Sequence, residues 1–496
     1  MASPDSIARR RHALAAVLAI ALAVRLWLVL THQYILFIDE TFQYLEQGHR
    51  LAFGSGVVPW EYVEGIRSWL LPALIAAIMR LAALIDPSPG GDVFAVRLGC
   101  IALSLVVPYV GFRVGERDGG LAGGVATGLL GALWYEALYF APVAMTEPIA
   151  AHVAILALWL GEQPGAPRRL ALSGILLGLA AVLRFQYAPP LALAVLWQQR
   201  HDCRALALVC AAGLATVAVL GGGLDALTWG APFQSVWLNI ARNTAGGVSA
   251  ALGTRPWWFT PSYFLAAWGP VFPLLLALAA LGARRFPALA IAFVATVALH
   301  ALTPHKEQRF IYLAMVAAPL LIGPGLMLLI RRLRRGSPSV AFAAAAALLL
   351  AAGEAATALA GATPPDAWHR GGAMIRAFAA AGAVPQVCGV AVRSLHVYFS
   401  GGYTYLQRDV PLYFESFDRS QFFAGLTVRL PLRVVLDGRD VPQPPDAALP
   451  AWQSRFNVVI GRPADALPGY ATVGCFGTES PGETRLCVFH RPGQCR

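Results

Sequence analysis

The chain has 496 residues, of which 57% are hydrophobic and only 13% are charged, and its formal net charge is +11 at pH 7. A soluble globular domain carries about 25% charged residues, so this composition excludes an ordinary water-soluble enzyme and indicates a chain that lies mostly in lipid. The positive charge does not indicate nucleic-acid binding, because the arginines stand in short runs between apolar segments, as in cytoplasmic loops of membrane proteins.

The first apolar segment follows Arg9, Arg10 and Arg11 and extends to Leu30. A secretory signal peptide would have a shorter apolar region and a small-residue cleavage site. This segment is long, contains Arg25 and continues directly into a polar motif. We therefore expect an uncleaved first span whose N-terminus lies in the cytoplasm.

The later apolar segments and the basic runs between them determine the predicted topology. If segment 68–85 crossed the membrane, the first basic cluster and most later clusters would face opposite sides; if it does not cross, all are cytoplasmic. We therefore predict a polytopic α-helical membrane protein with about eleven spans, in which 68–85 is a juxtamembrane or re-entrant helix. The apolar segments lie near residues 12–31, 68–85, 94–112, 121–139, 147–161, 170–183, 188–198, 205–223, 262–282, 287–302, 310–330 and 338–360.

This topology places the unusual polar groups on the outer face. They lie in the outer loops 32–67 and 224–261, at Glu147 and Arg184, and in the turn that contains His305. Each group alone could be a solvated loop charge. Their convergence on one face, while the inner loops carry mostly arginine, indicates an outward-facing site.

The composition changes after Gly361, which divides the chain into a multi-spanning domain, 1–361, and a polar, proline-rich domain, 362–496. Because the predicted number of crossings before it is odd, the second domain is expected to be extracytoplasmic. Its pattern of apolar segments and turns indicates a small α/β fold with a helix over 366–383. The predicted strands are Val387–Val392, Phe456–Ile460, Ala471–Phe476 and Arg485–His490.

Four of the seven cysteines lie in this second domain: Cys388, Cys475, Cys487 and Cys495. Cys475 and Cys487 flank a Ser-Pro-Gly turn symmetrically. This arrangement suits a cross-strand disulfide in an oxidising compartment, with free thiols as the alternative.

Lys306 is the only lysine of the chain, and it lies beside His305 and Glu307 and close to Arg309. A lysine ammonium is a compact charge suited to binding a phosphate. An isolated lysine at a membrane boundary could instead be a snorkelling cation. Four ionisable groups within five residues at such a boundary favour a functional site.

The first outer loop contains the most specific motif. Two adjacent acids stand in Ile38-Asp-Glu-Thr-Phe-Gln43. Trp-Glu and then Arg-Ser-x-x-x-Pro follow in Pro59-Trp-Glu-Tyr-Val-Glu-Gly-Ile-Arg-Ser-Trp-Leu-Leu-Pro72. In this order the motifs resemble those of the dolichol-phosphate-mannose-dependent mannosyltransferases. These form family 22 of the multi-spanning C-type glycosyltransferases, and the nearest likeness is the GPI mannosyltransferase III family. Further matching regions are Asp225–Gly230, Asn239, Asn243, Gly253–Trp258 and His305–Phe310, in order over roughly residues 35–320.

The sequence departs from the family pattern in two places. The usual His-Pro before the acids is Phe37-Ile38, and the Thr before Trp-Glu is Pro59. The C-terminal domain shows little of the eukaryotic pattern. Sugar and acceptor are therefore less defined by the resemblance than the class of reaction.

The resemblance implies inverting transfer of mannose from a polyprenyl-phosphate carrier to a hydroxyl of a lipid-linked or glycan acceptor. A carboxylate must take the acceptor proton, and we assign Asp39, with Glu40 as the alternative. The leaving phosphate needs cations, for which we assign His305, Lys306, Arg309 and Arg184. The phosphate leaves readily, so neither a metal nor a cofactor is expected. The residues assigned to the sugar are Trp60, Glu61, Arg67, Glu147 and Trp257.

Simpler roles remain open for several of these residues. Asp39, Glu40 and Glu147 also suit helix starts, Arg184 could be an interfacial anchor, and the tryptophans could belong to an aromatic belt. Two other functions also remain: transfer of another sugar from the same carrier, or transport of a lipid-linked sugar. A transporter would show repeated halves and polar groups near the midplane, and we find no repeat.

The expected partners are the lipid bilayer, the lipid-phosphate sugar donor and a glycolipid or glycan acceptor. The alanine- and arginine-rich composition suggests a bacterium of high genomic GC content. We therefore expect a bacterial inner membrane protein whose active site faces the periplasm, or the endoplasmic reticulum if the source is eukaryotic.

Overall fold

The computed structural model describes residues 4–86, 88–163, 166–334, 336, 338–364, 366–395, 397–414, 433–436, 439–441, 453–478 and 484–495. The chain divides into two compact units. Unit 1 comprises Met1–Leu28, Gly99–Phe233 and Leu252–Pro364, and unit 2 comprises Val29–Leu98, Gln234–Ala251 and Pro365–Arg496. The predicted boundary at residue 361 is a different division, because it separates residues by composition and by the side of the membrane on which they lie, and it stays a prediction.

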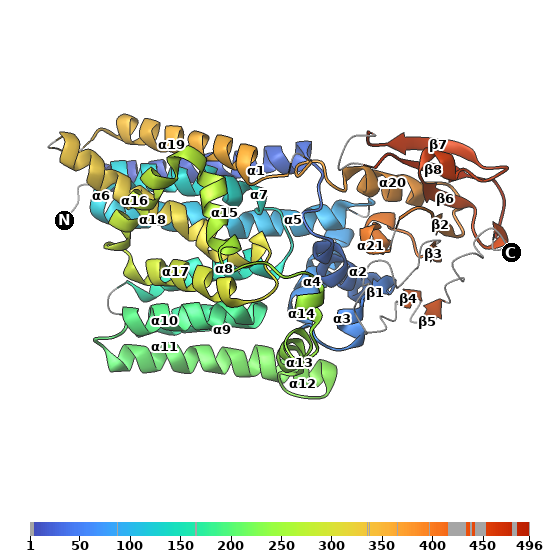
Figure 1. Cartoon of the computed structure of the whole chain (residues 1–496), viewed down its shortest axis with the longest axis horizontal. Coiled ribbons are helices and arrows are strands. Elements are labelled where there is room, and N and C mark those ends of the chain that lie inside the picture. The colour runs from blue at the N-terminus through green and yellow to red at the C-terminus, as the bar shows by residue number, and fades with distance from the viewer. Residues whose placement is uncertain are drawn as a thin grey trace. The chain divides into compact units, whose positions relative to one another are not determined.

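Unit 1 is a helical bundle (Figure 1). Over the described residues, six helical stretches are long and apolar enough to cross a membrane: Asp5–Thr31, Gly91–Leu133, Cys203–Trp229, Phe259–Ala283, Gln308–Arg334 and Val340–Gly361. The predicted number of about eleven spans includes shorter helices and stays a prediction. The helices that lie wholly or partly in unit 1 are α1 (Pro4–Thr31), α5 (Gly91–Ser104), α6 (Val106–Leu133), α7 (Tyr135–Tyr139), α8 (Thr146–Gly161), α9 (Pro167–Leu183), α10 (Ala188–Gln198), α11 (Cys203–Thr216), α12 (Leu224–Trp229), α15 (Phe259–Trp268), α16 (Phe272–Ala283), α17 (Pro287–Leu302), α18 (Tyr312–Arg334) and α19 (Val340–Gly361).

Helix α18 forms the centre of unit 1. In its most apolar 18-residue window, 89% of the stretch Gln308–Arg334 is buried, whereas the corresponding share is between 22% and 50% for the other five candidate spans. Helices α6, α8, α16 and α17 all pack against α18. The short 3₁₀ helix η5 (Gln308–Ile311) leads directly into α18, so the central helix fixes the position of the His305–Phe310 turn.

Helix α6 reverses direction at Gly120, whose φ of 58° and ψ of −152° are not helical. Its two halves then run side by side, so a Cβ at Gly115 would lie 2.1 Å from the carbonyl oxygen of Gly123. Only glycine permits this backbone conformation and this close approach. The reversal separates the two segments that the sequence predicts near 94–112 and 121–139.

The second half of α6 ends at Leu133 because Trp134 adopts an extended conformation. Arg25 of α1 stabilises this end. Its buried guanidinium donates hydrogen bonds to the carbonyl oxygens of Ala132 and Ala137 and to Ser104 Oγ. An arginine within the first span therefore satisfies carbonyl groups that a broken helix leaves without partners.

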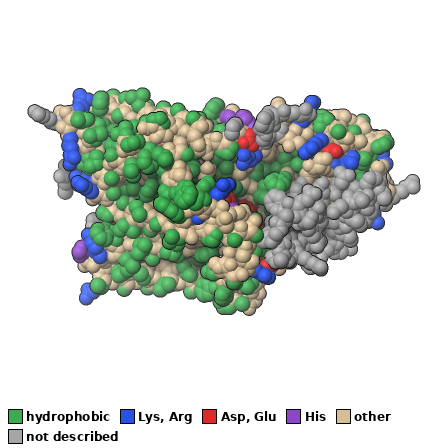
Figure 2. Space-filling view, in the orientation of Figure 1, with side chains coloured by type: hydrophobic (Ala, Val, Ile, Leu, Met, Phe, Trp, Pro, Cys, Tyr) green, Lys and Arg blue, Asp and Glu red, His purple; other side chains and the backbone are tan. Residues whose placement is uncertain are grey.

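The basic clusters of several loops meet at one end of unit 1. Arg10 pairs with Glu116, Arg117 with Glu162, and Arg285 with Asp118, while Arg331 donates to the carbonyl oxygen of Asp118. Figure 2 shows Lys and Arg side chains gathered at the end of the bundle that carries the N-terminus, next to a largely hydrophobic surface. Basic loops at one end of the bundle agree with the predicted topology, and the side of the membrane that this end faces stays a prediction.

Unit 2 contains a five-stranded sheet in the order β3-β2-β6-β8-β7. Strands β3, β2 and β6 are parallel, and β8 and β7 are antiparallel additions. Helix α20 (Gly372–Gly382) packs against β6, β7 and β8. The predicted strands are confirmed with adjusted bounds, and β3 was not predicted; the bounds are β2 (Val390–Val392), β3 (Leu412–Phe414), β6 (Val458–Gly461), β7 (Ala471–Phe476) and β8 (Leu486–His490).

The first outer loop belongs to the same unit. Its strand β1 (Gly56–Val58) pairs with β4 (Arg433–Leu436) from the C-terminal region, and β4 pairs with β5 (Arg439–Val441). Helix α4, which covers the predicted juxtamembrane segment 68–85, packs against α2. The other elements of unit 2 are η1 (Glu40–Leu45), α2 (Glu46–Phe53), α3 (Trp60–Val63), α4 (Leu70–Ile85), α13 (Gln234–Asn243), α14 (Val248–Ala251) and α21 (Gly402–Leu406).

The predicted disulfide between Cys475 and Cys487 is confirmed, and a second one joins Cys388 to Cys495. We expect non-reducing peptide mapping of protein from the native membrane to recover both linked pairs. Recovery of any of these four cysteines as a free thiol would contradict the pairing that contains it.

Glu46 ties the first outer loop to the C-terminal region. Its buried carboxylate accepts hydrogen bonds from the backbone N–H groups of Val57, Tyr403 and Thr404 and from the Thr404 hydroxyl, at 2.6–2.9 Å. Gly402 has a φ of +56°, and a Cβ there would lie 2.5 Å from the Glu46 carboxylate. The carboxylate thus occupies the start of α21 and stabilises the unit.

Replacing Glu46 with alanine should leave four buried hydrogen-bond donors without their acceptor. We expect Glu46→Ala to lower the free energy of unfolding of unit 2 by about 2–4 kcal/mol, measured as a lower thermal midpoint and faster proteolysis in detergent. Glu64→Ala removes a half-exposed ion pair with Arg242 and should cost less than about 1 kcal/mol. Equal stability of the two variants would show that the Glu46 contacts do not hold the unit.

Candidate active site

Asp39 lies at the start of η1, a π-helix whose first residue is Glu40. Its carboxylate is half-buried, and its Oδ1 accepts a hydrogen bond from Gln43 Nε2. The same nitrogen donates to Glu61 Oε1 at 2.8 Å. One amide group therefore connects two carboxylates, one from the adjacent acids and one from the Trp-Glu motif.

The two adjacent acids occupy different environments. Glu40 is buried to 1% exposure and interacts electrostatically with Arg97 and Tyr405, which are themselves joined by a hydrogen bond. Arg97 also donates to the carbonyl oxygen of Tyr34. Glu40 thus faces the interior of unit 2, and Asp39 is the more accessible carboxylate. This difference favours Asp39 over Glu40 as the base.

Glu61 is buried, and burial raises its pKa to about 7. The neighbouring Asp39 carboxylate also raises this pKa, whereas Arg67 and the Gln43 hydrogen bond lower it. Glu61 therefore exchanges between protonated and ionised forms near neutral pH. In the protonated form it could donate a hydrogen bond to a substrate oxygen, and in the ionised form it could accept one.

The remaining sugar-binding candidates differ in accessibility. Trp60 is buried beside Glu61 in α3, and Arg67 is half-buried. Trp257 is 65% exposed, as expected of a ring that could stack on a sugar or lie in the membrane interface. Asn239 donates to the carbonyl oxygen of Ile66, which connects α13 to the segment before Arg67.

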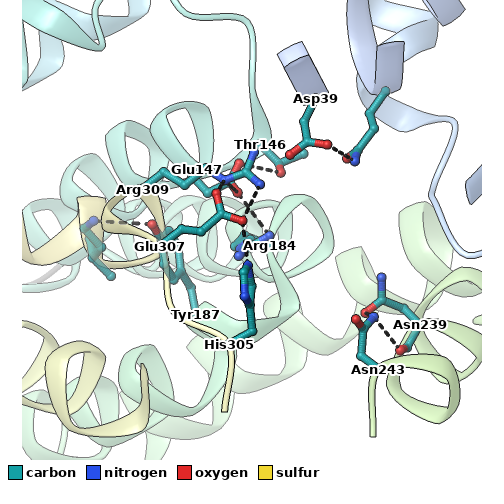
Figure 3. A network of polar contacts seen from close by, with 12 residues as sticks. Asp39, Thr146, Glu147, Arg184, Tyr187, Asn239, Asn243, His305, Glu307 and Arg309 are labelled. Carbon is teal, nitrogen blue, oxygen red and sulfur yellow. Dashed lines mark hydrogen bonds and ion pairs between the residues drawn. The ribbon is translucent and has the colours of Figure 1, made fainter. Parts of the chain in front are cut away.

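In unit 1, four predicted residues form one polar network (Figure 3). Glu147 lies 3.2 Å from Arg184 and 3.7 Å from Arg309, and all three side chains are almost fully buried. Arg309 also contacts Glu307 at 2.8 Å, and Glu307 contacts His305 at 2.8 Å. The start of α8, the end of α9 and the turn before α18 supply these side chains, because these helices pack against one another in the bundle.

The charges within this network affect its protonation. The hydrogen bond to Glu307 raises the pKa of His305, so His305 stays protonated to higher pH than an ordinary histidine. Burial alone would raise the pKa of Glu307, but Arg309 and His305 together lower it to about 2. Two arginines face two carboxylates, so the surplus positive charge comes from protonated His305 and from Lys306.

Lys306 is buried, and its ammonium donates to the carbonyl oxygens of Arg255 and Thr303. Its neighbour His305 binds the carbonyl oxygen of Gly253. The predicted phosphate-binding turn therefore also holds the backbone of the second outer loop. A third ammonium hydrogen is available in principle for a phosphate oxygen, because lysine carries three donors.

We expect Lys306→Ala to slow sugar transfer about tenfold or more, since both the charge and the two carbonyl contacts are lost. Lys306→Arg should restore activity only partly, because the planar guanidinium of arginine does not reproduce the contacts of a compact ammonium. Single-turnover rates and donor affinity measure the effect. Full activity of the arginine variant would remove the special role of lysine here.

Three residues near these groups were not predicted as site residues. Gln43 follows Asp39 by four positions, a spacing at which two side chains of a helix are neighbours. Glu307 adjoins Lys306 in the sequence, and in the structure it binds both His305 and Arg309. Tyr187 is fully buried, and its hydroxyl accepts the backbone N–H of Leu313; no motif in the sequence indicated it.

The sequence matches the family described as Alg9-like mannosyltransferases over residues 16–350. GPI mannosyltransferase 3 of Drosophila melanogaster is 30% identical over 254 residues, which cover 49% of this chain and 43% of that protein. Alpha-1,2-mannosyltransferase ALG9 of Saccharomyces cerevisiae is 28% identical over 306 residues, covering 55% of this chain and 52% of that protein. The chain spans about half the length of the curated relatives it matches.

The fold is similar to that of ArnT from Cupriavidus metallidurans, solved with bound undecaprenyl phosphate, with a TM-score of 0.63, 13% identity and 98% coverage of both chains. Archaeal oligosaccharyltransferase AglB from Archaeoglobus fulgidus, solved with an inhibitory peptide and a dolichol-phosphate, gives a TM-score of 0.54 at 13% identity, covering 93% of this chain and 70% of that one. These likenesses confirm the predicted C-type fold, and the family match extends over more than half of the sequence. The chain is therefore a multi-pass membrane protein that belongs to the Alg9-like mannosyltransferase family.

Proposed function

We propose that the chain transfers mannose from a polyprenyl-phosphate carrier to a hydroxyl group of a lipid-linked or glycan acceptor, with inversion at the anomeric carbon. Membership of the family supports mannose as the sugar. The lipid phosphates named with ArnT and AglB support a lipid-phosphate carrier as the donor. The observation that carries the proposal is the accessible carboxylate of Asp39, held by Gln43 within the family's acidic motif.

In the proposed reaction, the acceptor oxygen attacks the anomeric carbon while the bond from that carbon to the phosphate oxygen breaks. Asp39 takes the proton of the acceptor hydroxyl. The released lipid phosphate gains negative charge, which the cationic groups Arg309, Arg184, His305 and Lys306 would stabilise. Attack by one base-activated hydroxyl opposite the leaving group inverts the anomeric centre. A β-linked donor would thus give an α-mannoside.

We further propose that the reaction takes place at the outer face of a bacterial inner membrane. The support is the grouping of basic loops at one end of unit 1. The positive-inside rule assigns that end to the cytoplasm. Labelling of an engineered cysteine at position 305 from outside intact cells would agree with this orientation, and labelling only after permeabilisation would reverse it.

The sugar is tested with a panel of donors on one carrier. Purified protein in liposomes would receive polyprenyl phosphate linked to mannose, glucose or aminoarabinose, together with a membrane lipid extract as acceptor. We expect transfer from the mannose donor to exceed transfer from the other two. Preference for another sugar would make the chain a related transferase, and movement of intact donor across the bilayer without transfer would indicate a transporter.

A further inference from the structure

Gln43 occupies an unusual position between two carboxylates of unit 2. It is 4% exposed and lies within the π-helix η1, a winding that is rare and often found at functional sites. An amide nitrogen has two hydrogens, and here one is directed at Asp39 Oδ1 and the other at Glu61 Oε1. An ionised carboxylate oxygen only accepts hydrogen bonds, so the amide atom that faces Asp39 Oδ1 is the nitrogen, and the same nitrogen reaches Glu61 Oε1.

The backbone of Gln43 is held as firmly as its side chain. The Tyr62 hydroxyl donates to the carbonyl oxygen of Gln43 at 2.9 Å, and Tyr62 is itself buried. Tyr62 and Glu61 are adjacent in α3, so this short helix contacts Gln43 through both its main chain and its side chain. The amide therefore has little freedom to rotate away from Asp39.

We propose that Gln43 is a positioning residue for the base: its amide bridges the carboxylates of Asp39 and Glu61 and orients the Asp39 carboxylate toward the acceptor hydroxyl. The proposal rests on the proposed function, in which Asp39 is the base. A hydrogen bond to Oδ1 fixes the plane of the carboxylate, and this plane determines where Oδ2 points. Displacements of about 1 Å in such geometry can slow a reaction about 10²-fold.

The bridge should also affect how the rate depends on pH. A donor that binds an ionised carboxylate favours that form, so loss of the Gln43 amide should move the acid limb of the rate against pH. Other ionisable groups belong to α3 and η1, adjoin them or interact with their residues. They are Glu61 and Tyr62 in α3, Glu64 and Arg67 after it, Glu40 and Tyr44 in η1, Arg50 in α2, and Arg97 in α5.

Gln43→Met tests the bridge, because methionine has a similar length but no N–H group. We expect the single-turnover transfer rate to fall about 10–100-fold while the dissociation constant of the donor changes less than about threefold. The acid limb of the rate against pH should move to higher pH, since the base loses a donor. Gln43→Glu has the same shape but adds a negative charge, and it should move the acid limb further in the same direction.

Gln47 provides a matched control one turn along the chain. It is also a buried glutamine, but its Nε2 donates to the carbonyl oxygens of Phe42 and Val57 rather than to a carboxylate. Gln47→Met should lower thermal stability without moving the acid limb. The variants are compared at equal amounts of monodisperse protein, so that a folding defect does not count as slow transfer.

The outcomes separate the positioning role of Gln43 from the role of Asp39 as the base. A slow Gln43→Met with a shifted acid limb, and an unshifted Gln47→Met, would support the bridge. A Gln43→Met with the wild-type rate, or one whose acid limb does not move, would overturn it even if Asp39→Asn is inactive. If Gln43→Met fails to fold, the acid limb of the isosteric Gln43→Glu decides. An active Asp39→Asn would refute the base assignment, and the positioning role with it.

Discussion

Asp39→Asn should lower the rate of mannose transfer by a factor of about 10²–10⁴, while donor binding and folding stay nearly intact. Asparagine keeps the size of the side chain but cannot take the proton of the acceptor hydroxyl. The half-buried position of Asp39 leaves its carboxylate accessible to an acceptor, unlike the buried Glu40. Single-turnover transfer on a common donor measures the effect.

Glu40→Gln is the comparison for this prediction. Glu40 interacts with buried Arg97, so its loss should reduce stability more than the rate of transfer by correctly folded protein. An active Asp39→Asn together with an inactive but folded Glu40→Gln would exchange the two roles. Two active variants would refute the assignment of the acidic motif to catalysis.

The second large effect is expected at Arg309. Arg309→Gln should reduce transfer about 10²–10³-fold, because a charged donor for the developing phosphate charge is lost. It also leaves buried Glu147 with a single arginine partner, Arg184. Both a slower single turnover and weaker donor binding are expected.

Arg285→Gln is the matched control for Arg309. Arg285 pairs with Asp118 at the basic end of unit 1, and its side chain is 48% exposed. Its loss should change activity little, since exposed ion pairs contribute about 0–1 kcal/mol. If the two variants lose equal activity, the loss reflects charge or stability in general and not phosphate binding.

Much of the helical architecture is predictable because long apolar segments and basic loops obey strong physical constraints. The predicted topology places Glu147, Arg184 and Arg309 on one side of the membrane although they are far apart in sequence. In the structure both arginines contact Glu147. The Cys475–Cys487 bond was predictable from the equal spacing of the two cysteines about a Ser-Pro-Gly sequence, which itself lies outside the described residues; in the structure the two cysteines stand opposite each other in the antiparallel strands β7 and β8.

Other features depend on tertiary contacts that local patterns do not encode. The π-helix at Glu40–Leu45 has no distinctive composition, and it creates the bridge through Gln43. Strand β3 has only three residues, and they pair in parallel with the three residues of β2, so neither strand is long enough to show a periodic pattern. The role of Glu46 was equally hidden, because its four donors lie in β1 and in residues 403–404.

Lys306 shows how a correct observation can admit a second interpretation. Its singularity in an arginine-rich chain indicated a phosphate site. In the structure its ammonium binds two backbone carbonyl oxygens, so it also positions the second outer loop. A sequence shows which side chain is unusual, but it does not show which of its possible partners lies within reach.

Transfer of radiolabelled mannose from polyprenyl-phosphate mannose to a membrane lipid extract, by purified protein in liposomes, tests the central claim most directly. We expect a new mannosylated product of α configuration that accumulates with time, requires the protein and almost disappears with Asp39→Asn. Label that remains on the carrier in the presence of folded wild-type protein, across the acceptors of the extract, would contradict it.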